Sequence, residues 1–273
     1  MTLTPGRSDR SVGSVRSVRF LALFLLLALP RLTAAAQPPD YKPWQDLLAK
    51  HYDPAKGMGY KALKADDKPA LDRLRQQMAQ VDPAALAPKD RLAYWINLYN
   101  ISVVGIVVDH YPVDSIRDIS TDPIIRLNVF KKDSVATKSG RISLDTIENE
   151  KIREAFKDPR IHFAINCAAK SCPPIRPEPY VGARIDQQLD DQVRKFFSSP
   201  HNALFEKNER GVVVHVTKIM DWFKDDFEQW GGGRVAFLRK YLSPERQKII
   251  DPAQGNVTLE FNDYDWDLND AGR

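Results

Sequence analysis

Apolar residues recur at helical spacing along most of the chain, and this periodicity predicts a helix-rich protein. Asp-Pro pairs end the first two periodic segments, because proline cannot continue a helix. Between the later helices, alternating apolar and polar residues predict short strands. Single helices are predicted over residues 40–54, 61–81, 88–112, 143–156, 185–200 and 234–250, and a strand followed by a helix over 211–233.

The segment 88–112 is the longest helical pattern, and it is apolar on nearly all sides. Such a helix is predicted to be buried almost all round. Asn97 and Asn100 are its polar exceptions, and their spacing places them on the same face. A buried amide needs hydrogen-bond partners. Two interpretations stay open: the asparagines bind loop carbonyls as structural residues, or they orient a side chain in a cleft.

Residues 158–168 alternate in polarity as a strand does. In a strand, Ile161 and Phe163 would point to one side, and His162 and Asn166 to the other. The prolines that follow cannot continue a central strand, so a loop is predicted after it.

A further pair of strands is predicted at a hairpin whose turn is residues 138–140, and residues 256–270 are predicted to end the chain as a strand and an aromatic tail. Together these elements predict an α+β fold, a helix-rich single domain with a small, mostly antiparallel sheet. Four aromatic residues at helical spacing are predicted to lie in the core: Trp222, Phe223, Phe227 and Trp230.

The first 36 residues have the features of a secretory signal. A basic stretch is followed by an apolar run over 20–29, and then by the small-residue pattern of Ala34 and Ala36. The run is shorter than the ~20 apolar residues of a transmembrane helix; an uncleaved membrane anchor is the alternative interpretation. Cleavage after Ala36 would leave a single domain over 37–273 in a periplasmic or secreted protein.

The net charge gives no reason to expect a charged partner. The five arginines and one aspartate of residues 1–36 account for the whole formal charge of +4, so the remaining chain is formally neutral. A neutral chain gives no electrostatic reason to expect nucleic acid or, after cleavage, a membrane surface as a partner. The sequence does not define the oligomeric state.

The two cysteines of the chain, Cys167 and Cys172, allow three interpretations. In an exported protein they can form a disulfide, although a bridge across so short a loop stabilises little. A structural zinc site needs four ligands, and the sequence has no second pair at this spacing, so no metal is predicted. No glycine-rich phosphate loop is present, and no cofactor is predicted. The third interpretation is a nucleophilic thiol.

An active-site thiol requires a base and donors that hold the thiolate. His162 is the base nearest to Cys167 in sequence. In one straight strand the two would lie about 16 Å apart on opposite faces, so their contact requires a turn near Asn166. Glu148 is predicted to orient His162, and Asn97 or a backbone amide to stabilise an oxyanion. The alternative is a core histidine beside a buried, inert cysteine.

Four stretches together resemble a known family: AYWINLYN (93–100), ISLDTIEN (142–149), RIHFAINCAAKSCPPI (160–175) and YDWDLN (264–269). In this order they are similar to the domain of unknown function 547, over residues about 44–269. The resemblance implies a papain-like or transglutaminase-like thiol fold, with Cys167 as nucleophile, His162 as its histidine and Glu148 as the acid. Many members have a histidine where this chain has Asn149; if that histidine is the working one, this chain lacks it.

Two functions follow from the sequence. The first is an exported thiol-dependent hydrolase or transferase that acts on an amide or thioester. The second is a non-catalytic periplasmic binding or scaffold domain with a Cys167–Cys172 disulfide. Either would take a peptide or small-molecule ligand, with Asn97, Asn100 and Asn166 as predicted binding residues. A reversible redox pair is a weaker third interpretation, because the spacing is not Cys-x-x-Cys.

Overall fold

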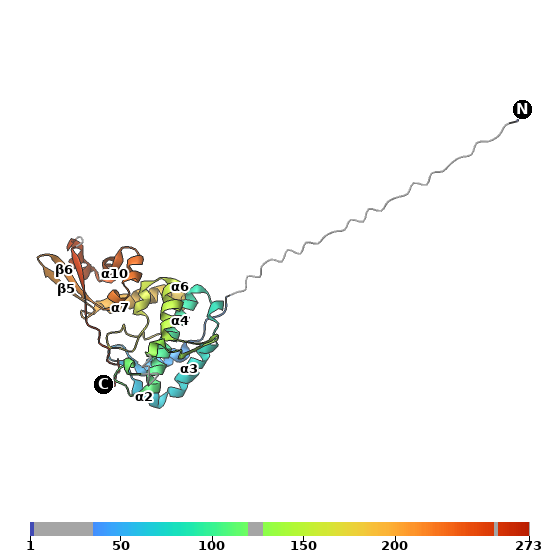
Figure 1. Cartoon of the computed structure of the whole chain (residues 1–273), viewed down its shortest axis with the longest axis horizontal. Helices are drawn as coiled ribbons and strands as arrows, with labels where there is room; N and C mark the ends of the chain where they lie inside the picture. Colours follow the sequence, from blue (N-terminus) through green and yellow to red (C-terminus); the bar gives the residue numbers. More distant parts are fainter. Residues whose placement is uncertain (3–34, 120–127, 254–255, 273) are drawn as a thin grey trace. The chain divides into compact units, whose positions relative to one another are not determined.

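A long central helix organises the first half of the fold. The computed structural model describes residues 1–2, 35–119, 128–253 and 256–272. Three helices, α1 (Lys42–His51), α2 (Tyr60–Asp66) and α3 (Lys68–Gln80), lie around α4 (Pro88–His110) (Figure 1). The single helix predicted over 61–81 is therefore two helices. The break comes at Asp67, just before Pro69 in the first turn of α3, where proline is tolerated.

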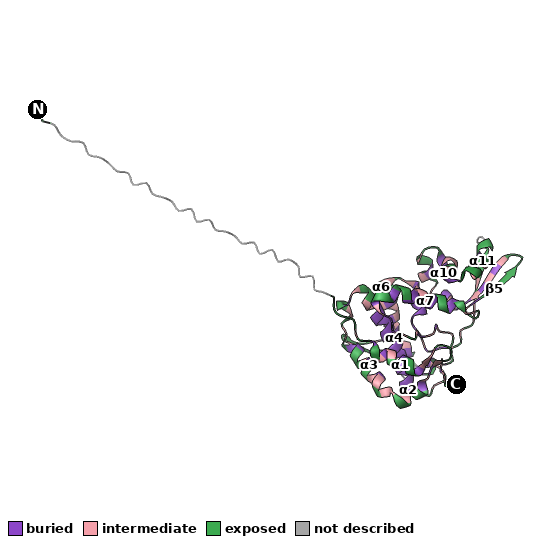
Figure 2. Ribbon diagram, turned by 180° about the vertical axis from the view of Figure 1, so that it is seen from behind, coloured by how far each residue is buried: buried purple, intermediate pink, exposed green. Residues whose placement is uncertain are grey.

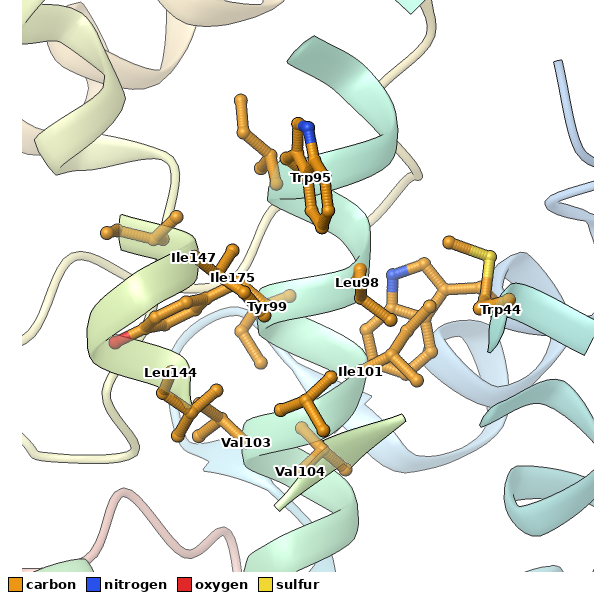
Figure 3. Packing of buried hydrophobic residues seen from close by; sticks show 14 of the residues in the cluster. Trp44, Trp95, Leu98, Tyr99, Ile101, Val103, Val104, Leu144, Ile147 and Ile175 are labelled. Carbon is orange, nitrogen blue, oxygen red and sulfur yellow. The ribbon is translucent and has the colours of Figure 1, made fainter. Parts of the chain in front are cut away.

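Helix α4 is buried along most of its length, as its pattern predicted (Figure 2). Leu98 and Ile101 lie on the side of Trp44, whereas Tyr99 lies on the side of Leu144 and Ile147 (Figure 3). The helix is long and apolar enough to cross a membrane, but 94% of its most apolar stretch is buried inside the fold. Packing on every side therefore explains its apolar composition.

The predicted hairpin is present as β3 (Val135–Thr137) and β4 (Gly140–Ile142). A continuous helical segment follows it. It begins as α5 (Leu144–Thr146), widens into a π-helix, η4 (Ile147–Arg153), and ends as α6 (Glu154–Phe156). Ser143 caps its start by accepting a hydrogen bond from the Thr146 amide. π-helical turns are rare and occur frequently at functional sites.

The second half of the fold is built on a small sheet. The order of its strands is β5 (Ala203–Asn208), β6 (Gly211–Val216) and β7 (Val257–Phe261), with β5–β6 antiparallel and β6–β7 parallel. The helices of this half are α7 (Ile185–Ser198), α8 (Ile219–Trp222), α9 (Lys224–Gln229), α10 (Gly233–Tyr241) and α11 (Pro244–Ile250). The structure thus confirms the helix-rich α+β class. The single helix predicted over 234–250 is wrong, because Pro244 begins a separate helix, α11, whose N-cap is Ser243.

Short elements complete the described chain. One small hairpin pairs β1 (Tyr52–Asp53) with β2 (Gly57–Met58). The turns of 3-10 helix are η1 (Pro83–Ala85), η2 (Ile116–Asp118), η3 (Val129–Lys131), η5 (Pro159–Phe163), η6 (Gly182–Arg184) and η7 (Asp251–Ala253).

The strand predicted over 158–168 is wrong, because residues 159–163 form the 3-10 helix η5. Asp158 caps it by accepting a hydrogen bond from the Arg160 amide, and Pro159 occupies the first turn, where proline is favoured. The chain then turns directly after Asn166. Its side-chain oxygen accepts a hydrogen bond from the Ala168 amide, 2.8 Å away, and Ala168 has a positive φ of 64°. His162 and Cys167 therefore do not lie in one straight strand. Neither the opposite faces nor the wide separation expected of such a strand applies to them.

Residues 35–273 form one compact unit with two apolar clusters. The first surrounds α4, and the second lies between α7, the sheet and α10. Helix η5 contributes to both, since Ile161 packs in the first cluster and Phe163 in the second. The histidine between them is thus held at the junction of the two clusters. Residues 3–34 of the predicted signal peptide lie outside the described chain.

Candidate active site

The loop that carries both cysteines, residues 164–174 (the cysteine loop), is held by hydrogen bonds to a side chain of α4. Asn100 donates a hydrogen bond from Nδ2 to the Ala164 carbonyl (2.9 Å) and accepts one at Oδ1 from the Asn166 amide (2.9 Å). Asn166 donates in turn to the Pro173 carbonyl (2.8 Å). Both asparagines are buried, so these bonds satisfy amides that water cannot reach.

Asn97 makes the same kind of contact one helical turn earlier. It donates to the Tyr180 carbonyl (2.8 Å) and accepts from the Tyr180 amide (3.0 Å). Asn97, Asn100 and Asn166 were predicted as ligand-binding residues. The structure gives all three backbone partners, and none of them lines the pocket beside Cys167. The structure therefore favours the structural interpretation of these amides, and Asn97 is not placed to stabilise an oxyanion there.

The C-terminal tail, residues 262–272, crosses the cysteine loop from the other side. The Lys170 amide donates to the Asp267 carbonyl (2.8 Å), and the Ser171 amide to the Asp265 carbonyl (3.2 Å). The Asn269 amide donates back to the Ala168 carbonyl (3.0 Å). Loop and tail thus form a short antiparallel contact, centred on the bridge between Ala169 and Leu268. This contact brings Tyr264 and Trp266 next to the cysteines.

A pocket of about 230 Å³ opens beside Cys167 (the Cys167 pocket). Its walls include all three residues predicted as catalytic, Glu148, His162 and Cys167. They come from the π-helix η4, from η5 and from the cysteine loop. The structure therefore brings the three residues to one cavity, although their roles stay predictions.

Cys167 is a free thiol with two polar neighbours. Its sulfur makes a hydrogen bond with Cys172 Sγ at 2.8 Å and another with the Tyr264 hydroxyl at 3.2 Å. The contact with Cys172 lowers the pKa of Cys167, against the effect of burial, and the Tyr264 hydroxyl lowers it further. Burial raises the pKa of Cys172 well above its usual range. Cys172 therefore keeps its proton and can donate it towards a Cys167 thiolate.

His162 is almost completely buried, at 3% exposed, and its ring stacks on Phe223 with centroids 3.9 Å apart. Its Nε2 hydrogen bonds to Asp226 Oδ2 at 2.7 Å. Its Nδ1 has no hydrogen-bond partner among the described residues. A buried nitrogen without a hydrogen-bond partner costs free energy. This atom therefore needs an explanation.

The charge states of this pair define the tautomer. Burial would raise the pKa of Asp226, but hydrogen bonds from His162 and Arg153 outweigh it and hold this pKa well below its usual range. Burial lowers the pKa of His162, although Asp226 acts in the opposite direction. An ionised carboxylate only accepts hydrogen bonds, so the neutral ring must carry its proton on Nε2. Nδ1 then has a free lone pair.

Glu148 was predicted to orient His162, and the hydrogen bonds correct this expectation, because Asp226 occupies that position. Glu148 instead accepts a hydrogen bond from the Tyr99 hydroxyl (3.4 Å). Burial raises the pKa of Glu148 to about 7, against the opposing charge of Arg153. No sequence pattern selects Asp226, which is far from His162 along the chain and belongs to no motif.

Arg153 links the site to Asn149. Its guanidinium holds Asp226 with two hydrogen bonds, from Nε (2.8 Å) and Nη2 (3.0 Å), and it lies over the Phe223 ring. Its Nη1 donates to Asn149 Oδ1. Asn149, the position where the resemblance implies a histidine in many members, therefore hydrogen bonds to the arginine that holds Asp226. It does not line the Cys167 pocket.

The prediction that Trp222 lies in the core is wrong. Its side chain is 47% exposed at the Cys167 pocket, whereas Phe227 is fully buried as predicted. Both helices in this region are short, and the chain bends between α8 and α9 at Phe223, so helical spacing does not hold across them. The aromatic tail supplies the neighbours of Trp222, with Tyr264 at 4.7 Å and Trp266 at 6.0 Å between ring centroids.

Comparison with known proteins agrees with the motifs. Residues 83–197 match the model of a family described as protein of unknown function, DUF547. This segment matches DUF547. The DUF547 segment contains three of the four motif stretches, with Glu148, His162 and both cysteines; YDWDLN lies outside it.

No curated protein and no solved structure matches the chain. The implied likeness to papain-like and transglutaminase-like folds therefore stays a prediction. Within the described parts of the chain, no group of three or more histidine, cysteine, aspartate or glutamate side chains is arranged to hold a metal ion.

Proposed function

We propose that this protein is an exported thiol-dependent hydrolase or transferase that acts on an amide or thioester. The proposal rests on one observation above all: Cys167 and His162 line the same pocket, and His162 Nδ1 has no hydrogen-bond partner among the described residues. A base with a free lone pair beside a thiol of lowered pKa is the arrangement that covalent thiol catalysis needs.

In the proposed reaction, Cys167 Sγ attacks the substrate carbonyl and its proton passes to His162 Nδ1. The bond to the leaving amine or thiol breaks, and the leaving group takes that proton. Water, or a second nucleophile, then attacks the thioester and gives a proton to Nδ1. Cleavage of the thioester returns the proton to Cys167. Nucleophile–base contacts often tighten only when substrate binds, and the structure gives no hydrogen bond between the two residues.

Three neighbours support this chemistry. Asp226 accepts the Nε2 proton and stabilises the imidazolium that forms when Nδ1 gains a proton. Tyr264, whose pKa burial raises well above its usual range, stays protonated and can donate to the Cys167 thiolate. Phe223 fixes the plane of the imidazole from one side. Each group thus has a fixed orientation before substrate arrives.

The test is the pH dependence of alkylation. The reduced chain from residue 37 onward is treated with iodoacetamide across pH 5–10, and modification of each cysteine is followed by peptide mass spectrometry. We expect Cys167 to react with a midpoint clearly below ~8.5, the value of an ordinary thiol, and Cys172 to stay unmodified. Cys167→Ser and Cys172→Ser variants assign the signals. A midpoint of Cys167 alkylation at the pH of an ordinary thiol would contradict the proposal.

The second candidate is the non-catalytic binding domain with a Cys167–Cys172 disulfide. The contact between the two sulfurs favours it, because only a small movement separates 2.8 Å from a bond of about 2.05 Å. The mass of the unreduced protein distinguishes the candidates. Loss of two hydrogens from protein purified without reductant, with unchanged ligand binding after reduction, favours the binding domain over the enzyme.

A further inference from the structure

Much of the lining of the Cys167 pocket is aromatic. Trp222, Tyr264 and Trp266 contact one another, with ring centroids 4.7 to 6.0 Å apart. Phe130 and Phe223 extend the same lining. Trp222 is one of very few large apolar side chains exposed in the described chain. An exposed tryptophan at the mouth of a pocket is typical of a binding surface rather than of a core.

The charged groups of the pocket are all of one sign. Asp145 and Glu148 line it, and among the described residues no lysine or arginine side chain does. Arg153, the nearest cation to Glu148 in the helix, is committed to Asp226 and Asn149. Neither Asp145 nor Glu148 has an ion-pair partner within the described ranges. An anionic ligand would therefore meet repulsion from Asp145 and Glu148, which the charge of Arg153 offsets only in part.

The free Nδ1 of His162 points to the same kind of ligand. It is a buried lone pair without a donor among the described residues, and it belongs to a residue that lines the same pocket. Ring faces, carboxylates and this lone pair have one property in common, since each attracts a positively charged N–H donor. A purely apolar ligand would satisfy the rings but would bring no donor to the two carboxyl groups or to Nδ1.

We propose that the Cys167 pocket binds its substrate through a primary ammonium group, held between the face of Trp222 and the carboxyl groups of Asp145 and Glu148. The volume of about 230 Å³ is below the usual range for drug-sized ligands, so it fits a side-chain-sized group such as that of lysine or a short diamine. This inference rests on the proposed function, because it names the substrate class for the same thiol. In a transferase, such an amine would be the group that accepts the acyl chain from Cys167.

The ammonium binding should depend on pH through Glu148. Its pKa of about 7 means that this carboxyl is partly protonated near neutrality, and a bound cation favours the ionised form. The groups that face Glu148 are the Tyr99 hydroxyl from α4, Asp145 from α5, Arg153 from its own helix, and Asp226 from α9. An alkylammonium stays charged up to about pH 10. Affinity should therefore rise from pH 6 to pH 8.

The experiment compares three probes of equal length: n-butylammonium, 1-butanol and butyrate. Each is titrated into the reduced Cys167→Ser protein from residue 37 onward at low salt, with tryptophan fluorescence and calorimetry as readouts. We expect n-butylammonium to bind at least about 10-fold tighter than 1-butanol, and butyrate to bind more weakly than either. In the Glu148→Gln variant, the rise of affinity between pH 6 and pH 8 should disappear.

Two variants test whether n-butylammonium binds in the Cys167 pocket. Trp222→Ala and Asp145→Asn should each weaken n-butylammonium binding by about 5- to 10-fold. Leu204→Ala is the matched control for Trp222, because its side chain is equally exposed, at 48%, but lies on β5 away from the pocket. Trp222 is on the surface, so its replacement should leave the fold intact even where Asp145→Asn does not.

Equal binding of n-butylammonium and 1-butanol, or a preference for butyrate, would overturn the inference. So would unchanged affinity in both the Trp222→Ala and Asp145→Asn variants. Because the probes bind without reacting, the result is independent of thiol chemistry. Ammonium binding with ordinary Cys167 reactivity would reject the enzyme alone, whereas an activated Cys167 without ammonium preference would reject only the substrate class.

Discussion

The DUF547 segment and the region that follows it contribute different kinds of residue to the Cys167 pocket. The segment supplies the candidate reactive groups, Glu148, His162 and Cys167. The later region supplies the groups that orient and surround them, including Asp226 and the aromatic residues of α8 and the tail. The DUF547 segment alone therefore supplies only part of the site. The YDWDLN motif adds Tyr264 and Trp266, whereas Asp226 and Trp222 become recognisable only when the chain is folded.

The two regions also differ in how they are held. The loop that carries Cys167 is held by hydrogen bonds between the backbone of Ala164 and Asn166 and the buried Asn100 side chain of α4, within the DUF547 segment. Asp226 is fixed by side chains alone, through Arg153 and His162. A substitution in the second region should thus alter chemistry with less effect on the fold than a substitution in the first. The predictions below test this difference, beginning with the largest effect.

Replacement of Asp226 should have the largest effect on activity. In Asp226→Asn the side-chain amide can donate to His162 Nε2, which places the ring proton on Nδ1, the wrong atom for a base. We expect a loss of about 10³–10⁴-fold in turnover of a model thioester. Nitrogen NMR shifts of His162 should report the change of tautomer. Asp225→Asn, at the exposed neighbour, is the control, and equal activity of the two variants would show that Asp226 does not orient the base.

Replacement of Asn166 should have the largest effect on stability. Asn166→Ala leaves the Ala168 amide and the Pro173 carbonyl without their partner inside the protein. Each unsatisfied buried group costs about 1–3 kcal/mol, so the free energy of unfolding should fall by about 3 kcal/mol in urea denaturation. Asn208→Ala, an exposed turn residue at the end of β5, is the control. A loss below about 1 kcal/mol would mean that the cysteine loop does not depend on this amide.

Glu148 should make stability depend on pH. Its pKa is raised from 4.5 to about 7 in the folded protein, so between these values the native state keeps a proton that the unfolded chain has lost. The free energy of unfolding therefore falls as pH rises through this window, by up to about 3 kcal/mol in total. Relative to wild type, Glu148→Gln should gain stability from pH 4.5 to pH 7 and then level off. Denaturation at several pH values, with Glu150→Gln as the exposed control, measures this gain. A constant difference across the range would contradict burial as the cause.

Tyr264→Phe should have the smallest effect. It removes one hydroxyl donor from Cys167 Sγ and leaves the ring in place. The pKa of Cys167 should rise by about one unit, because a hydrogen bond to a charged group contributes roughly 1.5–3 kcal/mol and Cys172 still donates. The midpoint of iodoacetamide alkylation measures the shift. An unchanged midpoint would leave Cys172 as the main donor to the thiolate.

The sequence predicted the regular parts of the fold well, because they follow from local periodicity. Burial of α4 and the hairpin at β3–β4 are examples. The conformation around His162 was not predicted, since alternating polarity over residues 158–168 fits a strand as well as the 3-10 helix that Asp158 and Pro159 initiate. Asp226 and the exposed position of Trp222 depend on tertiary contacts between distant segments, for which periodicity contains no signal.

The crossing of the cysteine loop by the C-terminal tail has a consequence for the order in which the protein is made. Cys167 leaves the ribosome long before Asp226 and Tyr264, which supply the orienting carboxylate and the hydroxyl donor. For the proposed function, this order means that the Cys167 thiol gains its hydroxyl donor, and His162 its carboxylate, only after the region that follows the DUF547 segment has been made.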